Sequence, residues 1–119
     1  MYEYNAKVVK VVDGDTVDLA VDLGFDIWHN IRIRLYGINC PEKNTDLGKT
    51  AKQFTIDNLP IDSFVVLKTV KDKAEKFGRI LGEITPVGND KTINKLLIEN
   101  NLAAEYFGVG SKEDHVPTA

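Results

Sequence analysis

The sequence predicts a mainly β fold with helices, of the α+β class, built from five strands and two helices. Two observations carry this prediction. Apolar and polar residues alternate over several short segments, which is typical of half-buried strands. Two other segments begin with a capping residue and continue with apolar residues at helical spacing. With 119 residues, 43% of them hydrophobic and 28% charged, the chain is expected to form a single domain over residues 1–119 with one core.

Three strands are expected in the first third of the chain. Lys7–Val12 is rich in valine and is followed by the turn signal Asp13-Gly14-Asp15. Val17–Leu23 alternates between apolar and polar residues, so these two segments should form a hairpin. Gly24 ends that hairpin, and Trp28–Tyr36 should add a third strand to give a meander. The third strand has an apolar face with Ile31, Ile33 and Leu35, and a polar face with Arg32, Arg34 and Tyr36.

Two helices and two further strands are expected after residue 44. Thr45 or Asp46 should cap the first helix, which Pro60 ends, and Thr92 should cap the second. Glycine inside a strand often marks a bend or a close approach of two backbones. The expected strands are Phe64–Val70 and Arg79–Val87, with a charged loop over Lys71–Lys76 between them and Gly82 inside the last strand.

The elements therefore follow the order of three strands, a helix, two strands and a helix. A helix between the third and fourth of five strands is the arrangement of an OB-fold, which is a partly open Greek-key barrel. Closure into a barrel is inferred from this order. Residues from about 108 to 119 include Gly110 and Pro117 and are expected to form a flexible tail.

The composition narrows the classes of function. The net charge of −3 gives no overall positive field for nucleic acid, so polyanion binding would rest on the basic cluster between Lys68 and Arg79. The lone Cys40 has no disulfide partner within the chain, and the distant His29 and His115 argue against a histidine-rich metal site. No apolar run has transmembrane length, so no membrane partner is expected. The N-terminus lacks a signal peptide pattern, which makes a cytoplasmic protein the default, although a trimmed secreted form would look the same.

Three short segments carry candidate chemistry, at residues 12–16, 34–42 and 75–82. Asp13 and Asp15 lie within one tight turn. A turn of this kind is common in hairpins, but two adjacent carboxylates repel each other unless a cation offsets their charge. Arg34 then ends a strand and is followed by a cramped turn that ends in Glu42. An arginine followed by a turn that ends in a carboxylate is typical of a site that binds an anion next to a general base. We expect the barrel to hold this turn against Asp13, Asp15 and Arg79.

Two residues in these segments have alternative interpretations. Cys40 could be a nucleophile, but no histidine or basic residue flanks it, and a small buried thiol is the favoured interpretation. Phe77, in the segment Glu75-Lys76-Phe77-Gly78-Arg79, could be a base-stacking platform or the lid of the barrel.

Together, three motifs resemble those of the staphylococcal nuclease (thermonuclease) family. That family carries Asp-Gly-Asp-Thr, then Arg followed by a Gly/Val-Ile-Asp-x-Pro-Glu turn, then Asp-Lys-Tyr-Gly-Arg. The counterparts here are residues 13–16, 34–42 and 75–79, in the same order and at compatible spacing. The resemblance extends from about Lys7 to Phe107. It implies an OB-fold barrel and a calcium-dependent phosphodiesterase that acts on DNA and RNA, on strands that are single or locally open.

The resemblance also implies roles for individual residues. Asp15 would be the main calcium carboxylate, with Asp13 a supporting acid outside direct coordination. Asn39 and the backbone carbonyl of Cys40 would complete the calcium site. Glu42 would be the general base that activates a water. Phosphate would be held by Arg34 and Arg79. Apart from the resemblance, Lys76 in the basic cluster and the aromatic residues Phe77, Tyr106 and Phe107 are expected to contact the substrate.

The chain departs from the family pattern at several positions. Asn39 replaces an aspartate, which removes a charge from the metal site but keeps an oxygen that calcium can bind. Glu75 and Phe77 replace aspartate and tyrosine, the stretch Gly24–Asn30 is longer than usual, and the lysine-bearing loop after Glu42 is missing.

Two rival functions stay open at this stage. The first is a catalytically weak or inactive OB-fold module that binds nucleic acid or protein. The second is a plain OB-fold oligonucleotide binder that uses Phe77, Tyr106 or Phe107 for stacking. The presence of Arg34, Glu42 and Arg79 together favours the nuclease. Preference for DNA or RNA, the polarity of cleavage and the oligomeric state also stay open.

Overall fold

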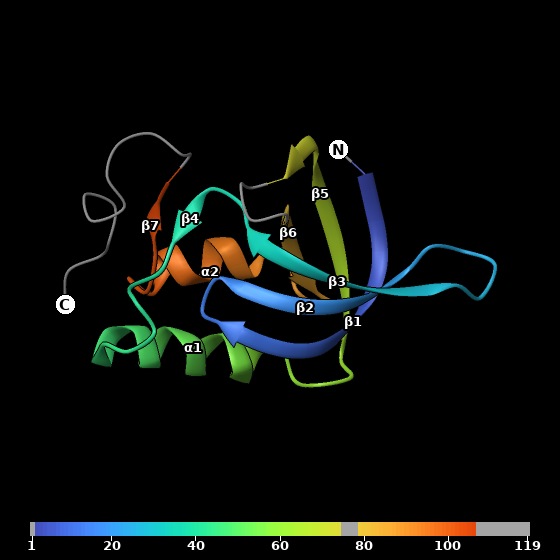
Figure 1. Ribbon diagram of the computed structural model, residues 1–119. Helices are drawn as coiled ribbons and strands as arrows, with labels where there is room; N and C mark the ends of the chain where they lie inside the picture. Colours follow the sequence, from blue (N-terminus) through green and yellow to red (C-terminus); the bar gives the residue numbers. More distant parts are fainter. Residues whose placement is uncertain (1, 75–78, 107–119) are drawn as a thin grey trace.

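The computed structural model describes residues 2–74 and 79–106, with residues 71–74 described by their backbone alone (Figure 1). Several positions singled out in the sequence lie outside this part of the chain. They are Lys76, Phe77, Phe107 and the expected tail at residues 108–119.

Five strands form a closed barrel in the order β1-β2-β3-β6-β5. All neighbouring strands pair antiparallel except β3 and β6, which pair in parallel. The sequence prediction of an α+β fold with an OB-fold barrel is therefore confirmed, as is the meander of the first three strands. The barrel strands are β1 (Tyr2–Asp13), β2 (Thr16–Asp22), β3 (Trp28–Leu35), β5 (Phe64–Ala74) and β6 (Ile80–Pro86).

Both predicted helices are present, and each is capped by a threonine side chain. Helix α1 (Asp46–Asn58) begins after Thr45, whose Oγ1 accepts the Gly48 N–H at 3.0 Å. Thr92 caps α2 (Ile93–Glu99) in the same way, by accepting the Lys95 N–H at 3.0 Å. Of the two candidate caps for the first helix, Thr45 is the correct one. Helix α1 lies against β1 and α2 lies against β6 (Figure 1).

Three features differ from the sequence prediction. β1 begins at Tyr2 rather than Lys7, because Tyr2–Lys7 pairs with β5. The loop expected from Lys71 is wrong over residues 71–74, where β5 continues and regains its pairing with β6 at Ala74 and Ile80 after an irregularity. Two short strands were not predicted, β4 (Ile38–Asn39) and β7 (Ala104–Glu105), which pair with each other. Two residues are too few to show a strand period.

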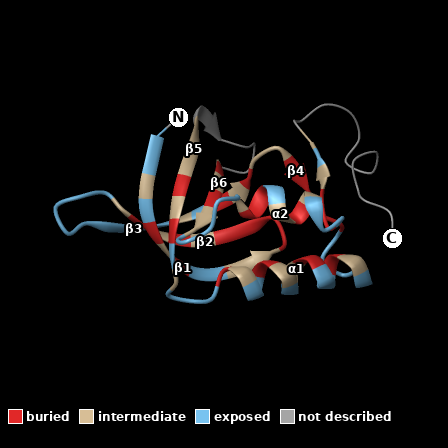
Figure 2. Cartoon of the chain, turned by 180° about the vertical axis from the view of Figure 1, so that it is seen from behind, coloured by how far each residue is buried: buried red, intermediate tan, exposed pale blue. Residues whose placement is uncertain are grey.

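The core fills the barrel with the inward side chains of alternating strand positions (Figure 2). Gly82 in β6 is the predicted close approach, since a Cβ there would lie 2.9 Å from Leu67 Cδ1 and 3.0 Å from the Lys68 carbonyl oxygen. Each large apolar side chain fully buried here stabilises the fold by roughly 1.5–3 kcal/mol. The largest of them are Leu19, Ile33, Leu35, Ile38, Leu59, Leu67, Ile84, Ile93 and Leu97.

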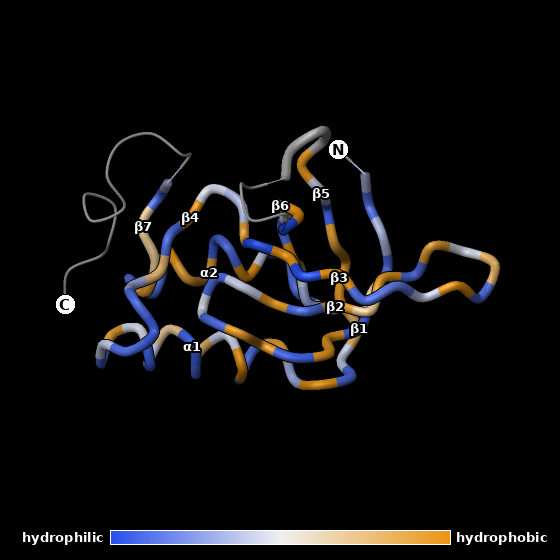
Figure 3. Tube along the Cα trace, viewed as in Figure 1, coloured by the Kyte–Doolittle hydropathy of each residue, from blue (hydrophilic) through white to orange (hydrophobic). Residues whose placement is uncertain are grey.

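The hairpin between β2 and β3 projects beyond the barrel, at the end of β3 opposite β4 (Figure 1). Apolar residues occur along it although it lies outside the core (Figure 3). Phe25, at its tip, is 98% exposed. Within the described residues, neither helix is long and apolar enough to cross a membrane.

Candidate active site

The turn between β1 and β2 is fixed by contacts with α1. Thr55 Oγ1 donates a hydrogen bond of 2.8 Å to the Gly14 carbonyl. A Cβ on Gly14 would lie 3.0 Å from Ala51 Cβ and 3.1 Å from Cys40 Sγ. Glycine is therefore needed here because the helix and the thiol approach the backbone closely. Sequence reasoning assigned no role to Thr55, because its partner lies far away in the chain.

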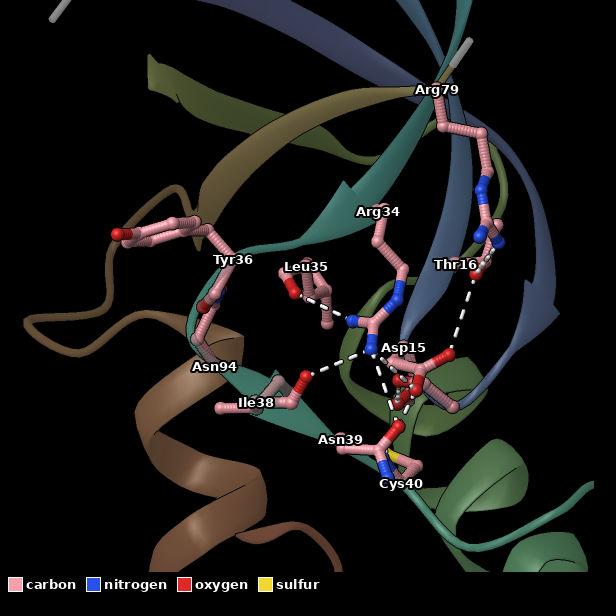
Figure 4. A network of polar contacts seen from close by, with 12 residues as sticks. Asp15, Thr16, Arg34, Leu35, Tyr36, Ile38, Asn39, Cys40, Arg79 and Asn94 are labelled. Carbon is pink, nitrogen blue, oxygen red and sulfur yellow. Dashed lines mark hydrogen bonds and ion pairs between the residues drawn. The ribbon is translucent and has the colours of Figure 1, made fainter. Parts of the chain in front are cut away.

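Asp15 lies at the centre of the site and is 9% exposed (Figure 4). Its Oδ2 accepts the Cys40 N–H at 3.0 Å and lies 3.5 Å from Arg34 Nη2. Its Oδ1 lies 3.4 Å from Thr16 Oγ1. The carboxylate is thus oriented by a backbone amide and a guanidinium. The predicted contact between the Arg34–Glu42 turn and Asp15 is confirmed.

Arg34 extends from the end of β3 into the turn that follows it (Figure 4). Its Nη1 donates to the Leu35 carbonyl at 2.7 Å, and its Nη2 donates to the Ile38 carbonyl at 2.9 Å. Nη2 also lies 3.4 Å from Asn39 Oδ1. Among the described residues, Nε–H makes no hydrogen bond. Arg34 therefore braces the turn through its terminal nitrogens and keeps a further donor for a ligand.

Arg79 reaches the same place from the start of β6. Its Nη1 donates to Thr16 Oγ1 at 3.4 Å, and that hydroxyl in turn faces Asp15 (Figure 4). Arg34 therefore contacts the buried carboxylate directly, and Arg79 is connected to it through Thr16, which is 2% exposed. Sequence reasoning assigned no separate role to Thr16.

The turn itself is held from two sides. Asn39 and Cys40 are buried, and β4 pairs with β7 through Asn39 and Ala104. Asn94 of α2 donates through Nδ2 to the Tyr36 carbonyl at 2.9 Å. Burial of Cys40 confirms the interpretation of a small buried thiol. The role of Asn94 was missed, although a buried asparagine within an apolar helix stripe is a signal that could have indicated it.

Glu42 is exposed at the end of the turn, and its backbone is fixed by the start of α1. Its carbonyl accepts hydrogen bonds from Thr45 N at 3.0 Å and from Thr45 Oγ1 at 2.7 Å. A Cβ on Gly48 would lie 1.8 Å from the same carbonyl oxygen. The start of the helix thus holds the backbone of Glu42, and the residue as a whole is exposed.

The chain matches the staphylococcal nuclease homologue family over residues 32–118. It belongs to that family. It is 33% identical over 119 residues to protein ParB of Escherichia coli, covering 94% of this chain and 63% of that protein. It is also 26% identical over 119 residues to a micrococcal nuclease of Shigella flexneri, covering 94% and 64%. An uncharacterized endonuclease of Escherichia coli is 31% identical over 108 residues, covering 87% and 62%. The chain spans less than two thirds of the length of these relatives.

The oxygen donors around Asp15 suit the hard cation that a nuclease of this family is expected to use. Calcium binds carboxylate, amide and carbonyl oxygens. Asp15 supplies a carboxylate and Asn39 an amide oxygen, while the contact of Cys40 with Asp15 is through its N–H. Asp13 Oδ1 is buried and has no hydrogen-bond partner among the described residues, so a nearby cation would offset its lost hydration. Among the described side chains, no group of three or more histidine, cysteine, aspartate or glutamate residues is arranged to hold a metal.

Of the predicted substrate-binding residues, Tyr106 lies within the described part. Its N–H donates to the Gly37 carbonyl at 2.8 Å. Tyr106 is therefore anchored to the same turn as Arg34 and Asn39.

Proposed function

We propose that the chain is a calcium-dependent nuclease that hydrolyses phosphodiester bonds of DNA or RNA with little sequence specificity. The observation that carries this proposal is the approach of Arg34 to the buried Asp15 and of Arg79 to the neighbouring Thr16. Two guanidiniums beside an oxygen-rich turn suit a phosphate, because Arg34 keeps its Nε–H as a donor while its terminal nitrogens bind the turn, and Arg79 adds a second positive charge. Membership of the staphylococcal nuclease homologue family supports the same activity.

In this mechanism each residue has one task. Glu42 takes a proton from water as the water oxygen bonds to phosphorus, and the bond to the leaving ester oxygen breaks. Arg34 and Arg79 stabilise the charge that develops on the phosphoryl oxygens. Asp15, Asn39 and the Cys40 carbonyl would hold calcium, with Asp13 supporting them. Bound calcium would add positive charge beside the phosphate.

The substrate would be a polynucleotide that is single-stranded or locally open. Lys76, Phe77, Tyr106 and Phe107 are the proposed substrate contacts. Phe77 and Phe107 would stack on bases, and Lys76 would meet a neighbouring phosphate.

Replacement of Glu42 by glutamine tests the proposed general base. The variant should lose turnover by about 10²–10⁴-fold, the usual contribution of a general base, while substrate binding changes little. Hydrolysis of a labelled oligonucleotide would be followed with calcium and with chelator. Glu99→Gln is the matched control, because Glu99 is an exposed acid paired with Lys91 at 2.9 Å. Near wild-type turnover in Glu42→Gln would remove Glu42 from the mechanism.

A catalytically weak or inactive binding module is the second candidate. It is favoured by the neutral Asn39 at a predicted ligand position and by the contacts of Arg34 with backbone carbonyls. Oligonucleotide binding with no hydrolysis under any calcium concentration would support this module and contradict the nuclease.

A further inference from the structure

We propose that Trp28 and Phe64, with Lys7 between them, form a platform on which bases of a single-stranded polynucleotide stack. The platform would lie at the opposite end of β3 from Arg34 and would hold the strand that runs away from the site. This inference rests on the proposed function, because it takes a polynucleotide as the substrate.

The strand register places the platform and the site on one face of the barrel. Alternate residues of a strand point to the same side, so Trp28 and Arg34 share the outer face of β3, opposite the buried Ile33. Lys7 pairs with Phe64 across β1 and β5, and it pairs with Ala20 of β2 on the other side. Arg34 lies six positions after Trp28 along the strand, which corresponds to ~20 Å at about 3.3 Å per residue.

The two rings are exposed and share one cation. Lys7 Nζ lies 5.6 Å from the centroid of the Trp28 ring and 5.7 Å from that of Phe64. Trp28 is 44% exposed and Phe64 is 57% exposed. Exposed rings of this kind offer faces on which bases of any sequence can stack, and a neighbouring cation adds attraction for the phosphate. Ala20 is small, so the outer face between these side chains is not filled by β2.

The charges between the site and the platform favour stacking over phosphate contacts. Arg32 is held by Asp18 through two hydrogen bonds, of 2.8 Å and 3.1 Å, and this contact raises the pKa of Arg32. The pair contributes little net charge to the face. Stacking requires unpaired bases, which selects single strands, and a path of this length suits the lower end of the roughly 4–16 nucleotides that OB-folds bind.

A second copy of the chain is the rival occupant of this surface. The nearby hairpin exposes Phe25 by 98% and Ile27 by 55%, and apolar side chains outside a core can mediate association. A polynucleotide is favoured because the rings flank a lysine and lie on the face that leads to Arg34. The experiments below separate the two occupants.

Trp28 is the only tryptophan of the chain, so its fluorescence reports on the platform alone. Glu42→Gln protein would be titrated with a single-stranded 12-nucleotide DNA and with a dinucleotide, in calcium. We expect saturable quenching of Trp28 by the longer strand only. Binding of the 12-nucleotide strand, measured by its anisotropy, without any change in Trp28 fluorescence would overturn the platform. Fluorescence that changes with protein concentration alone would assign the surface to a second copy and would also overturn it.

Cleavage kinetics give a test that does not depend on fluorescence. Trp28→Leu and Phe64→Ser should lower kcat/KM for the 12-nucleotide strand by roughly five- to a hundredfold, the cost of losing one stacked base. The loss should appear mainly in KM, because the contact is remote from the reacting phosphate. Cleavage of the dinucleotide should stay at the wild-type rate. Phe25→Asn is the matched control, since it removes an exposed ring away from Lys7 and should change neither substrate.

The outcomes distinguish this inference from the proposed function. Equal loss on both substrates, or no loss on the longer one, would overturn the platform while the nuclease stands. If the wild-type chain cleaves neither substrate, the nuclease fails, and quenching of Trp28 by the 12-nucleotide strand still decides the platform.

Discussion

Side chains on the outer face of strand β3 lie in opposite settings at its two ends. At one end, Arg34 is 13% exposed and donates to carbonyls and a buried acid. Only two residues away, Arg32 is 50% exposed and meets a single surface carboxylate. At the far end, Trp28 lies partly in solvent beside a hairpin that projects from the barrel. The strand is therefore rigidly braced at one end and exposed at the other.

In the proposed function, this difference separates chemistry from substrate capture. Helix α1, helix α2 and the short β4–β7 sheet all contact the braced end through Thr55, Asn94 and Asn39. Groups that stabilise a transition state must be held in place before the reaction. A surface that holds flexible single strands has no such requirement, because stacking tolerates sequence and small shifts.

Replacement of Arg34 and of Arg32 by lysine should break the apparent equivalence of these two arginines on one face of β3. Arg34→Lys should cost about 2–4 kcal/mol in transition-state binding, which is the scale of losing one positioned donor. Lysine keeps the charge but loses the planar fork that spans the Leu35 and Ile38 carbonyls. Measurement of kcat/KM on a labelled oligonucleotide would check this.

Arg32→Lys is the matched control for that experiment. It disturbs an exposed ion pair, which is worth about 0–1 kcal/mol, and should leave kcat/KM near the wild-type value. Near wild-type kcat/KM in Arg34→Lys as well would show that Arg34 acts only as a steering charge and does not clamp the phosphate. Thermal melting of each variant would exclude unfolding as the cause of a loss.

Asn39→Asp changes the end of β3 that carries Arg34, and its expected effect is smaller than that of Arg34→Lys. The new carboxylate should tighten calcium binding by about 1–3 kcal/mol, since repulsion and desolvation offset much of the direct attraction. Because Asn39 is fully buried next to Asp15, the calcium-free variant should be less stable at neutral pH. Calcium should then restore more stability to this variant than to the wild type.

Calorimetric titration and thermal melts, with and without calcium, would measure both effects. Asn89→Asp is the control, because it adds the same charge at an exposed loop position. Unchanged calcium affinity in Asn39→Asp would mean that residue 39 does not touch the metal, and the binding-module alternative would gain support.

Local signals explain which parts of the fold could be predicted. The alternation in β2, the threonine caps of both helices and the close approach at Gly82 all depend on residues near in sequence or on one property of glycine. The short β4 and β7 strands could not be predicted, because their pairing joins segments far apart in the chain and neither is long enough to show a period.

The same limit applies to the candidate site. The proximity of Asp15, Arg34 and Arg79 could be predicted from the three motifs, because a family resemblance carries spatial information that periodicity lacks. Strand alternation placed Arg32 and Arg34 on one polar face and could not separate them. The two arginines differ in exposure because the turn after β3 folds back over Arg34. Arg32 instead faces Asp18 across the pairing of β2 and β3.

The smallest expected effect is a change in stability at the tip of the hairpin between β2 and β3. Phe25 and Asp26 have φ values of 55° and 60°, and the Ile27 N–H donates to the Gly24 carbonyl at 2.9 Å. Two central residues with positive φ are those of a type I′ turn, which favours asparagine and glycine. Left-handed backbone strains a bulky residue, and Phe25 regains nothing by burial. Phe25→Asn should therefore raise the free energy of unfolding by about 0.5–1 kcal/mol.

Urea denaturation would measure this change against Val87→Asn. Val87 is also a large apolar side chain, 67% exposed, but it is not among the residues with positive φ. Its replacement relieves no strain and should stay within about 0.5 kcal/mol of the wild type. A loss of stability in Phe25→Asn that grows with protein concentration would show that the ring is buried against another copy. The exposed end of β3 would then be an interface, and its contrast with the braced end would disappear.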